Sequence, residues 1–155
     1  MTTSFALALH TTTTKLELAI AEINPNSDRN SQIYIIHKQQ SWELGRELSV
    51  QLHDCLNVFM GDLAWTDLAF LAIATGIGSF TGTRIGVVVA RTIGEQLQIP
   101  VYGIDCESIV TKAQQSDLPL SLGESLLAIA HDQWQAQWQT GVYPNWQDVL
   151  PIYEQ

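Results

Sequence analysis

The chain has 155 residues, of which 7 are Lys or Arg and 16 are Asp or Glu, so its formal net charge is −9. This length is typical of one domain, or of one domain with a fragment of a second. Its 46% of apolar residues are typical of a globular chain. Binding to nucleic acid without sequence preference depends on Lys and Arg, and neither occurs after Lys112. The composition therefore excludes a chain that grips nucleic acid by itself.

The compartment is inferred from features that the sequence lacks. The first fourteen residues contain no Lys or Arg and no long apolar run, which disfavours a signal peptide. No apolar run approaches the roughly 18 residues that a membrane helix needs. Cys55 and Cys106 lie far apart in apolar surroundings, as buried thiols do. We expect a cytoplasmic protein without a membrane segment.

The N-terminal part of the chain predicts three consecutive strands. Residues 4–10 and 15–23 are apolar runs joined by the short threonine link 11–14. A third run at 32–39 follows the turn-rich cluster 24–31. Strands that follow one another in this way predict an antiparallel meander.

Helices and strands alternate in the central part of the chain. The first helix is predicted to begin at an N-cap, Ser41, and to end at Gly61. Its apolar residues recur every three or four positions on one face: Leu44, Leu48, Leu52, Cys55, Leu56 and Phe59. Four further elements are a buried strand at 68–75, a helix at 82–98, a strand at 101–105 and a helix at 107–115. This order predicts an α/β fold, a mixed sheet with helices on its faces.

The pattern weakens beyond Ser116. Residues 125–131 and 133–140 are interpreted as two further strands, because apolar residues and glutamines alternate in the second of them. The last fifteen residues are rich in turn-forming residues.

The most informative segment, TGIGSFTGTRIG at 75–86, lies between a predicted strand and a predicted helix. Backbone N–H groups at such a helix start can hold an anion, with Arg84 nearby. The segment lacks the dinucleotide fingerprint, which needs glycine where Thr81 stands, and the Walker loop, which needs Lys after Gly82. Two interpretations stay open, a generic anion site and a tight turn that glycine permits.

The second predicted helix contains a ridge of small residues. They fall every four positions: Gly82, Gly86, Ala90 and Gly94. Glycine within a helix costs about 0.5–1 kcal/mol relative to alanine, so the ridge indicates close approach by another element, either the chain's own sheet or a partner helix. Apolar residues flank the ridge on other faces: Ile85, Val88, Val89, Ile93 and Leu97. We interpret this helix as part of a protein–protein interface.

The sequence shows no catalytic or metal-binding constellation. The histidines are scattered, without the spacing that places two ligands on one helix: His10, His37, His53 and His131. Ser79 and Thr81 do not form a Gly-x-Ser-x-Gly elbow and are better explained as caps of the helix that begins near Gly82. The alternative from another class is a nucleotide-binding or hydrolytic enzyme that uses the glycine loop 76–86.

The segment GIGSFTGTRIG at 76–86 closely resembles the Gly-Pro-Gly-Ser-Phe-Thr-Gly-x-Arg-Ile-Gly signature of the bacterial TsaB (YeaZ) family, with Ile77 in place of the proline. The signature residues are Gly76, Gly78, Ser79, Phe80, Thr81, Gly82, Arg84 and Gly86. LALHTTTTKLELAI at 7–20 resembles the first hairpin of the family, and IPVYGI at 99–104 resembles its strand after the second helix. The resemblance extends over residues 4–115.

The resemblance implies the fold of the actin/Hsp70-type ATPases, an α/β lobe of the ASKHA, RNase H-like kind. Residues 1–106 would form this N-terminal lobe, and residues 107–155 would be a reduced remnant of a second lobe. In ATP-using members of the fold, an aspartate that organises the metal stands where this chain has His10. A neutral imidazole cannot replace a carboxylate in holding magnesium-bound water.

The resemblance also implies a role without catalysis, cofactor or metal. TsaB-like proteins pair with a catalytic paralogue, TsaD, through a bundle of two helices from each chain. With a small ATPase, TsaE, they support transfer of a threonylcarbamoyl group to the adenosine beside the tRNA anticodon. This chain would meet tRNA only through that complex, and alone it would form a homodimer. The implied partner interface comprises Leu44, Leu48, Leu52, Leu56, Gly82, Ile85, Gly86, Val89, Ala90, Ile93 and Gly94.

Overall fold

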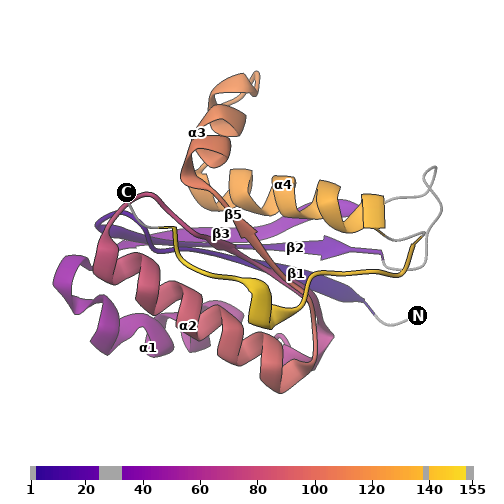
Figure 1. Cartoon of the computed structure of the whole chain (residues 1–155), viewed down its shortest axis with the longest axis horizontal. Helices are drawn as coiled ribbons and strands as arrows, with labels where there is room; N and C mark the ends of the chain where they lie inside the picture. Colours follow the sequence, from indigo (N-terminus) through magenta and orange to yellow (C-terminus); the bar gives the residue numbers. More distant parts are fainter. Residues whose placement is uncertain (1–2, 25–32, 138–139, 153–155) are drawn as a thin grey trace.

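The computed structural model of the chain describes residues 3–24, 33–137 and 140–152. Within these residues, five strands form one sheet in the order β3-β2-β1-β4-β5 (Figure 1). The first three form the predicted antiparallel meander, and the last two continue it in parallel with β1. The strands are β1 (Ser4–His10), β2 (Lys15–Ile23), β3 (Tyr34–Glu43), β4 (Leu68–Ala74) and β5 (Val101–Ile104).

Helices cover both faces of the sheet (Figure 1). α1 (Leu48–Met60) and α2 (Phe80–Leu97) lie together on one face, and α4 (Leu122–Gln137) lies on the other. α3 (Cys106–Gln115) connects β5 with α4 and extends away from the sheet. No helix in the described part of the chain is long and apolar enough to span a membrane.

Each central strand is buried on both sides, so its alternate residues contribute to different cores. On β1, Leu7 and Leu9 pack on the side of α1 and α2, whereas Ala6 and Ala8 pack on the side of α4. Small alanines on that second face leave room for α4 to lie close to the sheet. This double burial explains why β1 is an unbroken apolar run rather than an alternating one.

The two strands predicted beyond residue 116 are wrong, because residues 122–137 form α4. A capping box starts the helix: the Ser121 hydroxyl accepts the backbone N–H of Glu124 at 3.0 Å, and the Glu124 carboxylate accepts that of Ser121 at 3.3 Å. Buried residues recur at helical spacing along it: Leu126, Leu127, Ala130, His131 and Trp134. The end of the second predicted strand includes residues 138–139, which lie outside the described residues.

The N-cap predicted at Ser41 is also wrong. Ser41 pairs with Glu17 of β2, and this ladder extends β3 to Glu43. A 3-10 turn at Gly45–Glu47 follows, with Gly45 at a φ of 51°, and α1 begins only at Leu48. Pairing with a neighbouring strand therefore outweighs the local capping preference of Ser41.

The C-terminal segment (yellow in Figure 1) returns to the sheet. The backbone N–H of Ile152 donates to the carbonyl of Thr75 at 2.7 Å. Trp146 packs closely against α2 at Gly94: a Cβ added to Gly94 would lie 3.0 Å from the Cβ of Trp146. Residues on both sides of the predicted boundary at 106 thus pack on one sheet; the assignment of 107–155 to a second-lobe remnant stays a prediction.

Candidate functional site

The signature loop lies against the turn of the first hairpin. The backbone N–H of Ser79 donates to the carbonyl of Thr12 at 2.7 Å, and the hydroxyl of Thr11 donates to the carbonyl of Gly82 at 2.7 Å. Gly76 has a φ of 114°, a left-handed conformation that favours glycine. The predicted tight turn between strand and helix is therefore confirmed.

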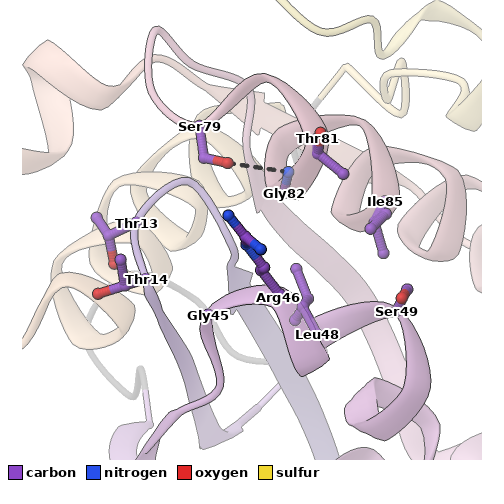
Figure 2. A pocket seen from close by; sticks show the side chains of 10 residues that line it. All are labelled: Thr13, Thr14, Gly45, Arg46, Leu48, Ser49, Ser79, Thr81, Gly82 and Ile85. Carbon is purple, nitrogen blue, oxygen red and sulfur yellow. Dashed lines mark hydrogen bonds between the residues drawn. The ribbon is translucent and has the colours of Figure 1, made fainter.

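Ser79 is the N-cap of α2, as predicted. Its hydroxyl oxygen accepts the backbone N–H of Gly82 at 3.1 Å (Figure 2). Thr81, which was also predicted as a cap, lies inside the first turn of α2 instead. The hydroxyl of Ser79 thus has a structural task at the start of the helix.

The ridge of small residues on α2 faces the chain's own sheet and hairpin, one of the two explanations that the sequence left open. All of its members are buried: Gly82, Gly86, Ala90 and Gly94. A Cβ on Gly86 would overlap the hydroxyl of Thr11 and crowd Ile73, and a Cβ on Gly94 would overlap Val101. These residues of the predicted interface therefore present no surface to a partner.

The predicted interface leucines of α1 are also covered by this chain. Leu48, Leu52 and Leu56 are 7%, 1% and 2% exposed, because they pack into the core between α1 and the sheet. Leu44 precedes the helix and is half-buried. Periodicity identified the apolar face of the helix correctly, but that face is the one that meets the sheet.

The remaining predicted interface residues lie on another side of α2. Ile85, Val89 and Ile93 are half-buried, and Val88 beside them is 62% exposed. Their spacing of three and four residues forms one stripe along the helix. We call Ile85, Val88, Val89 and Ile93 the docking stripe.

A pocket of about 450 Å³ lies where the hairpin turn, the 3-10 turn before α1 and the start of α2 meet (Figure 2). Hydroxyl groups and one guanidinium dominate its polar lining: Thr13, Thr14, Ser49, Ser79, Thr81 and Arg46. Leu48 and Ile85 form its apolar side. A pocket of this composition suits a small anionic group.

The cation of this pocket is Arg46 rather than Arg84. The Arg84 guanidinium lies over the ring of Phe80, 5.2 Å from its centroid, and does not line the pocket. Figure 2 shows Arg46 pointing into the space between the hairpin turn and the start of α2. Arg46 is not among the predicted site residues, because the sequence predicts a longer helix that includes it, whereas in the structure it lies in the 3-10 turn before α1.

His10, at the end of β1, is a buried neutral histidine. It is 2% exposed, and its Nδ1 has no hydrogen-bond partner among the described residues. Burial lowers the pKa of His10 from 6.5 to about 4. By strand alternation it shares the α4 side of β1 with Ala6 and Ala8, and it is not among the residues that line the pocket. The described residues also contain no group of three or more His, Cys, Asp or Glu placed to hold a metal ion.

The buried state of His10 predicts a pH dependence of stability. Between its folded pKa of about 4 and its unfolded value near 6.5, the unfolded chain binds a proton that the folded chain does not. The free energy of unfolding should therefore fall by about 3 kcal/mol from this group as the pH drops from 6.5 to 4. Urea unfolding measured across that range checks the loss.

The matched variant for this experiment is His10→Gln, which removes the titrating group. Its stability should fall less steeply over the same pH range, with a residual slope from His131, whose pKa burial also lowers. Equal slopes for the variant and the unmodified chain would show that His10 does not carry the effect.

Solved structures with the same architecture define the class of the fold. An uncharacterised protein from Pseudomonas aeruginosa, described as similar to peptidase YEAZ, has a TM-score of 0.71 at 15% identity and covers 98% of this chain and 100% of its own. YeaZ from Pseudomonas aeruginosa has a TM-score of 0.70 at 15% identity, with 97% and 100% covered. RuvC from Thermus thermophilus has a TM-score of 0.60 at 9% identity, with 90% and 99% covered. The chain therefore has the predicted fold, a mixed sheet with flanking helices of the RNase H-like, ASKHA type.

Sequence comparison then identifies the family. The model for TsaD, tRNA N6-adenosine threonylcarbamoyltransferase, matches residues 29–125, more than half of the chain. The tRNA threonylcarbamoyladenosine biosynthesis protein TsaB of Bacillus subtilis (strain 168) is 28% identical over 132 residues, which cover 84% of this chain and 52% of that protein. The chain belongs to this TsaD-like family, on its TsaB (YeaZ) branch.

A second TsaB relative matches a shorter segment. The protein of the same name from Buchnera aphidicola subsp. Schizaphis graminum (strain Sg) is 39% identical over 46 residues, 30% of this chain and 22% of that protein. The chain thus spans about half the length of the Bacillus relative that it matches and less of the other.

Proposed function

We propose that the chain is a non-catalytic subunit of a tRNA threonylcarbamoyladenosine machinery and docks a TsaD-type catalytic subunit through α1 and α2. The biochemical setting is supported by membership of the TsaB branch, whose curated relatives are named for biosynthesis of this modified nucleoside. The single observation that carries the docking surface is the stripe of aliphatic residues on α2 that the chain's own core covers only in part: Val88 is 62% exposed, and Ile85, Val89 and Ile93 are half-buried.

The docking stripe has the geometry that helix packing requires. Ile85, Val89 and Ile93 fall every four residues, so they form one ridge that fits the groove of a second helix. Val88, at 62% exposure, extends the stripe toward solvent, and burial of a valine side chain contributes about 1.5–3 kcal/mol. α1 lies beside α2 and contacts it, so a partner's pair of helices would complete a four-helix bundle.

Two features support a role without catalysis. His10 occupies the strand end where ATP-using members of the fold have a carboxylate, and its buried neutral imidazole lacks the oxygen donors that magnesium prefers. The hydroxyl of Ser79, the best placed nucleophile in the signature loop, is engaged as a helix cap. These observations favour a structural role both for the end of β1 at His10 and for the signature loop at Ser79.

Other partners follow from the same proposal. A TsaE-type ATPase would join the heterodimer, and tRNA would be bound through the catalytic subunit rather than by this acidic chain. In the absence of the partner, the docking stripe would pair with that of a second copy, because a self-complementary apolar surface favours a symmetric dimer.

The experiment that tests the function is complementation. Cells depleted of their own TsaB-type protein would express this chain together with the TsaD-type protein of its own organism, and threonylcarbamoyladenosine would be quantified in their tRNA. We expect the modification to be restored with both proteins and to stay absent with either alone. Failure of the pair to restore it would contradict the proposed function.

The alternative to the docking function is a nucleotide-binding protein. The pocket beside the signature loop is where such a protein would bind its nucleotide. Arg46 and the surrounding hydroxyls are groups that bind phosphate in many proteins. Calorimetry of the isolated chain with ATP and magnesium separates the two functions. Saturable binding in the micromolar range would favour the alternative, whereas the proposed docking function predicts no such binding.

A further inference from the structure

We propose that the pocket at the start of α1 and α2 receives a carboxylate side chain from the docked partner, with Arg46 as its counter-charge. This inference rests on the proposed docking function and names the chemistry of the partner's contact at one end of the docking stripe. The two can fail separately, because docking by apolar contacts alone needs no charge at Arg46.

The lining of the pocket is suited to an oxyanion. Thr13, Thr14, Ser49 and Thr81 are among the residues that line it, and no carboxylate is among the described residues of that lining. Figure 2 shows the Arg46 side chain pointing into the cavity from the 3-10 turn before α1. A guanidinium can donate two parallel hydrogen bonds to one carboxylate, which fixes the orientation of the bound group.

The Arg46 guanidinium is available for such a bond. Among the described residues, none forms a hydrogen bond or an ion pair with it. Glu47, its neighbour in sequence, is exposed and does not line the pocket. Arg46 is exposed, and it is the one Lys or Arg among the described residues that line the pocket of this acidic chain. A lone cation at the pocket favours an acidic ligand at this place.

The surrounding backbone adds to the positive potential. The first turn of α2 contains no acidic residue and its N-cap is Ser79, so the partial positive charge of its backbone N–H groups is not offset there. At α1 the effect is smaller, because the N-cap of that helix is Glu47. Ser49 and Thr81, in those first turns, both line the pocket. This contribution is secondary to that of Arg46, because it falls off within one turn of each helix.

The position of the pocket points to a partner's side chain as the occupant. Ile85 lines the pocket and is also the first residue of the docking stripe. A partner helix packed along Val89 and Ile93 would therefore pass the mouth of the pocket at that end. Docking would cover the mouth, and removal from water strengthens the bond between a carboxylate and Arg46.

The test is the affinity of the Arg46→Gln variant for the TsaD-type protein of the same organism, measured by sedimentation. We expect affinity to fall about 30-fold, because the partner's carboxylate would be buried without its counter-charge. Arg46→Lys should recover part of the loss, since it restores the charge without the fork. Lys112→Gln on α3 removes the same charge away from α1 and α2, and it should bind as the unmodified chain does.

The other possible results separate the carboxylate contact from the docking function. Unchanged affinity of Arg46→Gln would overturn the carboxylate contact and leave the docking function in place. Absence of binding by the unmodified chain would overturn both. Binding of inorganic phosphate by the free chain, lost in Arg46→Gln and without competition from the partner, would make the pocket a small-anion site and overturn the assignment to a partner carboxylate.

Discussion

Replacing Gly86 by alanine is expected to lower the free energy of unfolding by about 3 kcal/mol. A Cβ at this position would overlap the hydroxyl of Thr11 and lie 3.1 Å from Cδ1 of Ile73. Thr11 cannot move aside easily, because it is fully buried and its hydroxyl donates to the carbonyl of Gly82. The gain of about 1 kcal/mol in helix propensity from glycine to alanine is too small to offset this overlap. Urea unfolding followed by circular dichroism measures the difference.

A control on the same helix isolates the effect of packing. Val88→Ala changes an exposed residue of α2, so the stability of that variant should stay within about 0.5 kcal/mol of the unmodified chain. If Gly86→Ala were as stable as Val88→Ala, α2 would not contact the hairpin as described. The expected loss also means that substitutions at Gly86 cannot test docking, since they would disturb the fold itself.

The second large effect concerns docking. Val88→Arg should lower the affinity for a TsaD-type partner by about 100-fold, because it places an unpaired charge in the middle of an apolar helix contact. Val88 is 62% exposed in the free chain, so the substitution leaves the fold and its free energy of unfolding almost unchanged. Titration of the partner with each variant by calorimetry measures the affinity.

The matched control for this variant is Val110→Arg. Val110 is 42% exposed and belongs to α3, a helix that lies on the other side of the sheet from α1 and α2 (Figure 1). Val110→Arg adds the same charge at a different place, so this variant should bind the TsaD-type partner with the affinity of the unmodified chain. Equal binding by Val88→Arg and Val110→Arg would show that the docking stripe is not the contact surface.

Much of the fold follows from local patterns in the sequence. Long apolar runs predicted the central strands, and the glycine segment marked the turn from β4 into α2. The pattern failed for residues 122–137, where the alternation of tryptophan and glutamine suggested a strand. The capping box of Ser121 and Glu124 was the signal for a helix there, and the buried positions follow its period.

The candidate site was harder to predict, because it depends on contacts between distant segments. The spacing of Gly82 and Gly86 required a close neighbour, but only the structure shows that this neighbour is Thr11 of the hairpin. Likewise, Arg84 stood nearest to the glycines in sequence, whereas Arg46 reaches the pocket from the start of α1. Helical periodicity identifies an apolar face, but it does not tell whether a sheet or a partner covers that face.

The most direct test of the account is sedimentation of the chain with the TsaD-type protein of its own organism, at micromolar concentrations of both. We predict a one-to-one complex that forms with the unmodified chain and with Val110→Arg, and that is lost with Val88→Arg. If the unmodified chain and the TsaD-type protein sedimented independently, the proposal that the chain docks a TsaD-type subunit would be contradicted.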